Sequence, residues 1–116
     1  MMSAITTQVF DTARGRPACG LPVTLEIQAA DASWRQLGHG ITDADGRAPG
    51  LLPEGMPLVI GTYRLLFETA AYFVANRVEG FFPRVTVLFE VRDPGRAYHV
   101  PLLLSPHGYS TYRGSQ

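Results

Sequence analysis

LPVTLEIQAA, residues 21–30, alternates apolar and polar side chains through its central part. Its apolar members are Val23, Leu25 and Ile27, and polar side chains separate them. Successive side chains of a β-strand point to opposite faces, so this period of two places one face in a core and the other in water. The stretch therefore predicts a half-buried strand.

The same alternation returns further along the chain in GTYRLLFET and RVTVLFEV. The apolar members are Tyr63, Leu65, Phe67, Val85, Val87, Phe89 and Val91. These side chains are typical of strands with one buried face. Leu66 and Leu88 fall on the faces expected to meet water. Single exposed leucines are ordinary, but two of them favour a face that contacts another subunit.

Turn and loop signals separate the strands. Asp45-Gly46 predicts a tight hairpin turn, because both residues tolerate a positive φ, and it places Arg47 just beyond that turn. LLPEGMPLVIG, residues 51–61, has two prolines and two glycines around short apolar runs. It is therefore expected to be a connector and not a central strand.

One stretch is compatible with a helix. TAAYFVANRVEG predicts about two turns over residues 70–77, with Thr69 as N-cap and Gly80 beyond the end. Several short strands, nine prolines and twelve glycines point to an all-β antiparallel sandwich closed by Greek-key connections. At 116 residues the chain is expected to form a single domain over residues 1–116.

Composition excludes several classes of partner and site. Ten basic and ten acidic residues cancel, so nucleic acid and anionic membrane surfaces are poor partners. Cys19 is the only cysteine, which excludes an internal disulfide and a thiolate metal cluster within one chain. We expect no secretory leader, because MMSAITTQVF is neither basic nor apolar enough, and no membrane span, because no run approaches about 20 apolar residues. We expect a soluble cytoplasmic protein.

Four separated motifs carry a family resemblance. They are DTARGRPA at 11–18, TDADGR at 42–47, FFPRVTV at 81–87 and YRGS at 112–115. In this order and spacing they resemble the 5-hydroxyisourate hydrolases, the purine-catabolic branch of the transthyretin-like family, from about Thr6 to Ser115. The terminal tetrapeptide distinguishes these hydrolases from the hormone-carrying transthyretins.

The resemblance implies a transthyretin-like sandwich of two four-stranded antiparallel sheets with one short helix. It also implies a homotetramer, built as a dimer of dimers, with active sites in the channel where the dimers meet. The implied reaction is hydrolytic ring opening of 5-hydroxyisourate, a small purine-derived substrate, on the route from urate to allantoin. No cofactor is implied.

The family site comprises two histidines, an arginine and the tetrapeptide. Matched onto this sequence, the implied catalytic residues are His99, Arg47 and Ser115. The implied substrate-binding residues are Gln8, Arg47, Tyr112, Arg113 and Gly114. The first family histidine falls on Gln8, and Gln116 extends the chain one residue past the usual terminal serine.

These residue types suit the reaction. Ring opening of a cyclic acyl urea needs a water deprotonated for attack on a carbonyl, together with a group that holds the developing oxyanion. An imidazole supplies the first and a guanidinium the second. Glutamine accepts no proton near neutral pH, so if Gln8 replaces the base, the expected loss is about 10²–10⁴-fold. If His99 is the base, Gln8 could retain much of the rate.

Spacing alone leaves other interpretations open. His99 alternates with core-like neighbours and is equally well a solvent-facing strand residue. Arg47 is then a solvated loop charge, and Tyr112 and Arg113 are frayed surface. His39 and His107 gain no support from the motifs, and three histidines without paired spacing predict no metal site.

Two other functions remain possible from the sequence. The first is a catalytically weak or inactive transthyretin-like protein that binds a small molecule, which Gln8 favours and the retained Arg47 and His99 disfavour. The second is a structural sandwich that joins protein partners, which only the half-apolar outer faces favour.

Overall fold

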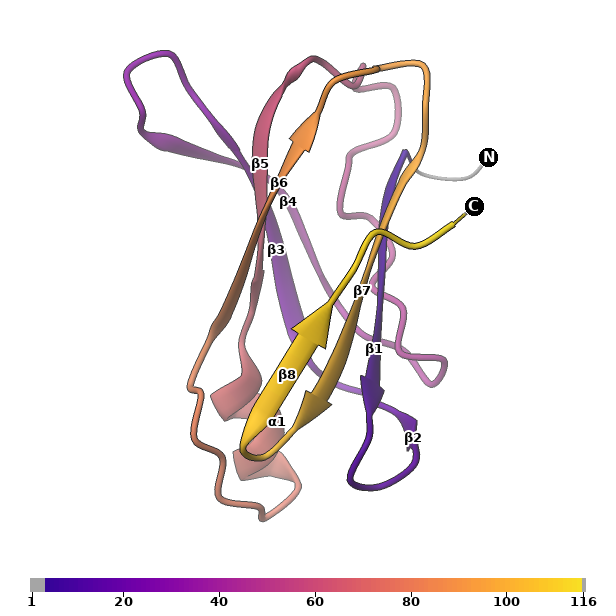
Figure 1. The fold of residues 1–116 in the computed structure, drawn as a ribbon, viewed down its shortest axis with the longest axis vertical. Coiled ribbons are helices and arrows are strands. Elements are labelled where there is room, and N and C mark those ends of the chain that lie inside the picture. Colours follow the sequence, from indigo (N-terminus) through magenta and orange to yellow (C-terminus); the bar gives the residue numbers. More distant parts are fainter. Residues whose placement is uncertain (1–3, 116) are drawn as a thin grey trace.

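Two four-stranded sheets form the molecule in the computed structural model, which describes residues 4–115. The first sheet has the order β2-β1-β7-β8, and the second has the order β4-β3-β5-β6 (Figure 1). The strands of the first sheet are β1 (Ile5–Asp11), β2 (Arg16–Pro17), β7 (Tyr98–Ser105) and β8 (Gly108–Thr111). Those of the second are β3 (Pro22–Gln28), β4 (Trp34–Ile41), β5 (Gly61–Phe67) and β6 (Val85–Val91). The predicted sandwich is confirmed.

One strand pair departs from the antiparallel prediction. All pairs of the second sheet are antiparallel, but β1 runs parallel to β7, with Thr6 opposite His99. Parallel neighbours cannot be joined by a short hairpin. Here the chain between β1 and β7 contains every strand of the second sheet. The first sheet is therefore mixed.

The core lies between the sheets, where the predicted apolar positions point. Eight of the predicted apolar residues are buried: Val23, Leu25, Tyr63, Leu65, Phe67, Val85, Val87 and Val91. Two more, Ile27 and Phe89, are half-buried and pack against this core. Of the two leucines out of phase, Leu66 is half-buried and Leu88 is 60% exposed. The period-two alternation therefore identified the inner face of each of these strands.

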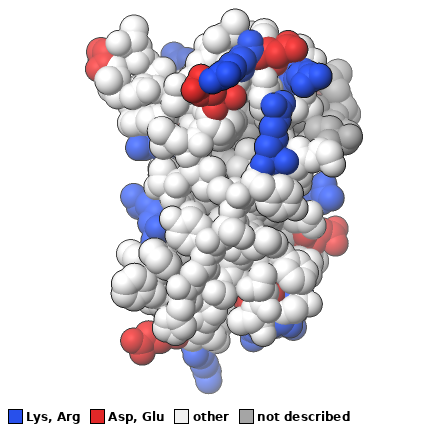
Figure 2. Space-filling model, in the orientation of Figure 1, with Lys and Arg blue, Asp and Glu red and all other residues white. Residues whose placement is uncertain are grey.

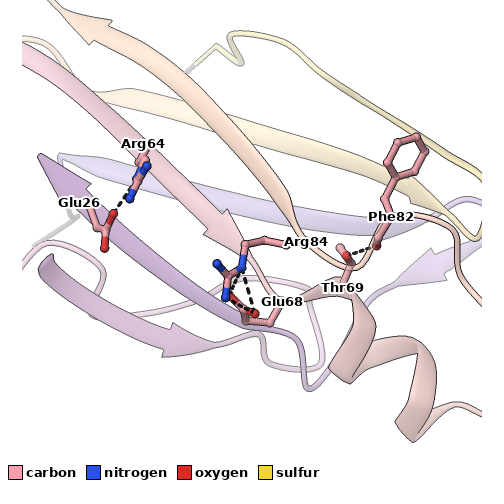
Figure 3. A network of polar contacts seen from close by, with 6 residues as sticks. All are labelled: Glu26, Arg64, Glu68, Thr69, Phe82 and Arg84. Carbon is pink, nitrogen blue, oxygen red and sulfur yellow. Dashed lines mark hydrogen bonds and ion pairs between the residues drawn. The ribbon is translucent and has the colours of Figure 1, made fainter. Parts of the chain in front are cut away.

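Polar contacts occupy part of the outer face of the second sheet. The guanidinium of Arg64 donates to Glu26 at 2.6 Å and lies 4.1 Å from the ring centroid of Trp34. Figure 3 shows this pair and a second pair, in which Arg84 donates to Glu68. These charged and aromatic side chains thus form their ion pairs and cation–π contact within the same chain.

The helix α1 (Thr69–Ala75) begins one residue before its predicted start. Thr69 was expected to be the N-cap, but Glu68 occupies that position and makes no side-chain cap hydrogen bond. Thr69 is buried instead, and its hydroxyl donates to the carbonyl of Phe82 at 2.5 Å (Figure 3). A tertiary hydrogen bond has replaced the expected local one. The side chains of Tyr72 and Phe73 are buried and form the inner face of the helix.

The predicted Asp45-Gly46 turn is present, but it is not a hairpin between two strands. The amide of Gly46 donates to the carbonyl of Asp43 at 2.9 Å, and Gly46 alone of the pair has a positive φ, +78°. The turn follows the end of β4 and docks on β1, because Val9 donates its N–H to the Gly46 carbonyl at 2.8 Å. Residues 51–60 form the expected connector outside the strands.

Within residues 4–115, no helix is long and apolar enough to cross a membrane.

Candidate functional site

The outer face of the first sheet brings β1 and β7 residues together. Thr6 and Gln8 point outward from β1, since their neighbours Thr7 and Val9 are buried. His99 points outward from β7 between the buried residues at 98 and 100. The parallel register pairs Thr6 with His99 and so places the imidazole within two residues of Gln8 along the face.

His99 is held on two sides. Its Nδ1 lies 2.8 Å from the hydroxyl oxygen of Thr6, a hydrogen-bond distance. On the other side, the N–H of Gly114 donates to the His99 carbonyl at 2.8 Å. A Cβ at position 114 would lie 2.6 Å from Cδ2 of His99, so only glycine allows this approach. The YRGS segment thus packs its glycine directly against the imidazole.

Electrostatics keep this imidazole neutral. Burial lowers the pKa of His99 and the nearby Arg47 charge lowers it further, whereas a hydrogen bond to the Thr6 backbone raises it. Both lowering effects disfavour the protonated ring. Since an unperturbed histidine has a pKa of about 6.5, His99 is a proton acceptor at neutral pH.

Gln8 fastens the turn that carries Arg47. Its Nε2 donates to the Asp45 carbonyl at 2.9 Å, and Gln8 and Arg47 form an isolated antiparallel bridge. A Cβ at Gly46 would lie 2.3 Å from the Val9 carbonyl oxygen, so glycine is required for the turn to dock on β1. This contact explains the glycine of the TDADGR motif.

Arg47 presents a guanidinium to this face without an acidic partner. The side chain is exposed, and none of the ion pairs among residues 4–115 involves it. A free guanidinium beside a neutral imidazole suits a substrate that develops negative charge on oxygen.

The terminal tetrapeptide lies between two surface cavities. A cavity of about 350 Å³ opens between the edges of β6 and β8, and its lining includes His99, Tyr112 and Arg113. A second, of about 320 Å³, is lined in part by Gly114 and Ser115. The Arg113 guanidinium lies 4.6 Å from the ring centroid of Tyr98. The predicted residues 112–114 therefore adjoin His99, whereas Ser115 lines a different cavity.

Comparison with known proteins places the chain among relatives. A sequence profile of the HIUase/Transthyretin family matches residues 5–114. The chain belongs to this family.

Relatives from both branches of the family resemble the chain. It is 45% identical over 111 residues to the 5-hydroxyisourate hydrolase of Salmonella typhimurium, covering 96% of this chain and 80% of that protein. The fold superposes on the 5-hydroxyisourate hydrolase of Klebsiella pneumoniae with a TM-score of 0.81 at 33% identity, over 96% of this chain and 92% of that one. It superposes on sea bream transthyretin in complex with thyroxine with a TM-score of 0.89 at 31% identity, over 98% and 97% of the two chains.

The remaining histidines of this family member lie away from the site. His39 is exposed on β4 of the second sheet, and His107 is exposed between β7 and β8. Among the residues that the structure describes, no group of three or more His, Cys, Asp or Glu side chains could hold a metal ion. Gln116, which departs from the family terminus, lies outside the described residues.

Sequence reasoning missed Thr6. The signal was available, because Thr6 lies two residues before Gln8 and the strand period places both on one face. Its contact with His99 depends on the parallel pairing of β1 with β7, however, and no local sequence motif predicts that pairing.

Proposed function

We propose that this chain hydrolyses 5-hydroxyisourate, opening its ring in the degradation of urate to allantoin. One observation carries the proposal: a neutral imidazole, His99, and an unpaired guanidinium, Arg47, share the outer face of the first sheet beside the YRGS segment. The hydrolases among the relatives support the same activity.

The proposed chemistry assigns a role to each side chain. Nε2 of His99 takes a proton from water, and the resulting hydroxide attacks a ring carbonyl of the substrate. Arg47 holds the oxygen on which charge develops, and its planar donors also fit the flat heterocycle. The ring opens when the carbon–nitrogen bond of the tetrahedral intermediate breaks and the leaving nitrogen takes the proton that His99 removed from water, which returns the imidazole to its neutral form. These steps require neither a metal nor a cofactor.

The other predicted residues orient the substrate in this proposal. Tyr112 and Arg113 line the cavity that His99 also lines. Gly114 packs against the imidazole, and Ser115 bounds the substrate from the neighbouring cavity. The Gln8 amide holds the Arg47 turn through Asp45 and leaves its own oxygen as a hydrogen-bond acceptor.

We also propose that the working unit is a homotetramer, a dimer of dimers, in which outer faces of the first sheet line a channel. His99 and Gln8 lie on a face that a lone sandwich leaves open to solvent. The exposed free thiol of Cys19 fits a reducing compartment, and we place the activity in the cytoplasm.

Freshly generated 5-hydroxyisourate, followed by its ultraviolet absorbance, tests the activity. His99→Gln is expected to lower kcat by about 10²–10⁴-fold, the usual contribution of a general base. The matched control is His39→Gln, on the exposed face of the second sheet. The wild-type rate should fall with acidification only below pH about 6.5, because the pKa of His99 is lowered. Equal rates for His99→Gln and wild type would exclude the proposed base.

A second candidate function is binding without turnover. Gln8 favours it, because its amide cannot act as a base, and sea bream transthyretin is a ligand-binding structural relative. Urate-like inhibitors that bind with no detectable hydrolysis would establish this function. A structural scaffold, favoured by exposed Leu88, would instead be a monomer that binds no purine.

A further inference from the structure

The contact between Thr6 and His99 is built into the sheet. Seven consecutive residue pairs fix β1 against β7, from Ile5 opposite Tyr98 to Asp11 opposite Leu104. On the inner side of the same strand, the buried hydroxyl of Thr7 donates to the Val100 carbonyl at 2.6 Å. The backbone of Thr6 therefore has little freedom to move away from His99. Its hydroxyl oxygen lies 2.8 Å from Nδ1.

The groups around Nδ1 favour a proton on that nitrogen. A hydroxyl can either donate or accept, so the Thr6 side chain alone fits either tautomer of a neutral imidazole. The Thr6 hydroxyl is the group in direct contact with Nδ1, at 2.8 Å, and it can accept from that nitrogen. The Thr6 backbone acts in the same direction, since its hydrogen bond to the ring raises the pKa of His99. With Nδ1 donating toward Thr6, Nε2 keeps its lone pair free.

The opposite edge of the ring is also constrained. Gly114 lies so close to Cδ2 of His99 that a Cβ there would come within 2.6 Å of it. Rotation of the ring is thus limited by Thr6 on one side and by the YRGS backbone on the other. This arrangement orients the nitrogen that a hydrolytic reaction needs.

We propose that Thr6 is a positioning residue, which holds His99 as the Nδ1–H tautomer so that Nε2 faces the substrate as the acceptor of the water proton. The kinetic part of this inference rests on the proposed hydrolase function. The tautomer itself does not, because it is a property of the free protein.

Several charged groups lie near this imidazole, and each can influence the pH dependence of an activity that depends on His99. Arg47 approaches from the turn docked on β1 and disfavours the imidazolium. Arg113 from the C-terminal segment and Glu90 from β6 line the same cavity as His99. Thr6 itself carries no charge, so replacing it leaves these electrostatic effects in place.

Nitrogen-15 NMR of the imidazole measures the tautomer directly in the ligand-free protein at pH 8. Wild type is expected to show His99 protonated on Nδ1. Thr6→Val keeps the β-branched shape but removes the hydroxyl, and it should move the population toward the Nε2–H form. Thr6→Ser should keep the wild-type pattern. An unchanged tautomer in Thr6→Val, or a wild-type ring protonated on Nε2, overturns the proposal; if Thr6→Val does not fold, Thr6→Ala replaces it.

Kinetics supply a second readout. Thr6→Val is expected to lower kcat about 10-fold to 10²-fold with little change in KM, part of the ~10²–10⁴-fold contribution of a general base. Thr6→Ser should restore most of the rate. The matched control is Thr24→Val, because Thr24 on β3 is likewise half-buried and stands opposite His39 on the neighbouring strand. Loss of kcat in Thr24→Val equal to that in Thr6→Val would show a general packing effect and overturn the positioning role.

The two failures are distinguishable. If wild type forms the Nδ1–H tautomer but hydrolyses no 5-hydroxyisourate, the proposed function fails and the structural role of Thr6 stands. If wild type hydrolyses 5-hydroxyisourate and Thr6→Val is as fast, the function stands and the positioning role fails.

Discussion

Gln8 is a tether in this structure and not a proton acceptor. Its Nε2 is committed to the carbonyl of Asp45, in the turn that precedes Arg47. An amide has no basic lone pair near neutral pH, and the proposed function therefore assigns proton transfer to His99, whose pKa is lowered by burial and by Arg47. The glutamine at position 8 therefore ties the turn before Arg47 to β1.

The substitution Gln8→His tests this division of roles. A half-buried outward-facing position should accept an imidazole with little strain, and its ring N–H can replace the amide as donor to Asp45. If His99 is the base, as proposed, the gain in kcat should be less than about tenfold, well under the ~10²–10⁴-fold contribution of general base catalysis. Steady-state kinetics measure it. A gain of about 10²-fold or more would assign the base to the first strand instead.

A substitution at Arg47 can separate the effect of its positive charge from that of its planar guanidinium geometry. Arg47→Lys keeps the positive charge but loses the planar fork of donors, so kcat should fall on the order of 10²-fold, the size of a lost oxyanion donor. The side chain is exposed, so the free energy of unfolding should change by no more than about 0.5 kcal/mol. Denaturant titration and kinetics give the two numbers. The control is Arg35→Lys on the outer edge strand β4, and unchanged kinetics in Arg47→Lys would remove Arg47 from the site.

Motifs located most of the candidate site, and two of them, TDADGR and YRGS, contain a glycine whose local geometry is demanding. Gly46 and Gly114 approach other atoms more closely than a side chain allows, and each lies beside a predicted polar residue. Thr6 could not be found in the same way, since its partner lies 93 residues away. Ser115 was expected to act with His99, a role that remains a prediction.

At the scale of elements, patterns set by the strand itself were predictable and patterns set by a distant partner were not. The alternation of β3 and β5 depends on which side faces the core, and every predicted apolar position is buried or half-buried. The N-cap of α1 was wrong because the Thr69 hydroxyl binds Phe82, in a segment that follows the helix. The parallel direction of β1 against β7 has no local signal at all.

One hydrogen bond ties α1 to the first sheet and can be tested. The Tyr72 hydroxyl donates to Oδ2 of Asp11 at 2.7 Å, and both residues are buried. Burial and Asp11 raise the pKa of Tyr72 to about 12, so the phenol stays a donor at neutral pH. Tyr72→Phe leaves the Asp11 carboxylate with only its Arg14 amide contact, and it should lower the free energy of unfolding by about 1–3 kcal/mol.

Urea titration at pH 7 measures that loss. Tyr109→Phe is the matched control, because Tyr109 is 43% exposed and its ring packs edge-on against Phe82. We expect the control to lie within about 0.5 kcal/mol of wild type. A Tyr72→Phe protein as stable as its control would mean that the Asp11 carboxylate finds another donor.

At the scale of the whole molecule, the two outer faces differ. The second sheet carries the Glu26–Arg64 pair and the Trp34 ring on its outer face, contacts complete within one chain, and it also exposes Ile41 and Leu88. The first sheet instead presents Phe10 in line with Gln8, beside an imidazole and an unpaired guanidinium. The outer face of the first sheet is therefore suited to contact a second copy. Figure 2 shows a different side, the one on which β6 and β8 lie nearest the viewer, and there charged side chains lie at the ends and flanks around a mostly uncharged middle.

Phe10 offers a test of the proposed tetramer. If two dimers meet through the outer faces of the first sheet, Phe10 is repeated across a twofold axis, and Phe10→Glu would bring like charges together in the interface. Wild type should sediment as a tetramer at micromolar concentration, and Phe10→Glu as a dimer with reduced kcat/KM because its channel is open. Ile41→Glu is the control, since Ile41 is 62% exposed on the second sheet and its charge should leave the tetramer intact. A stable wild-type monomer would contradict the assembly, and a Phe10→Glu tetramer of full activity would place the interface elsewhere.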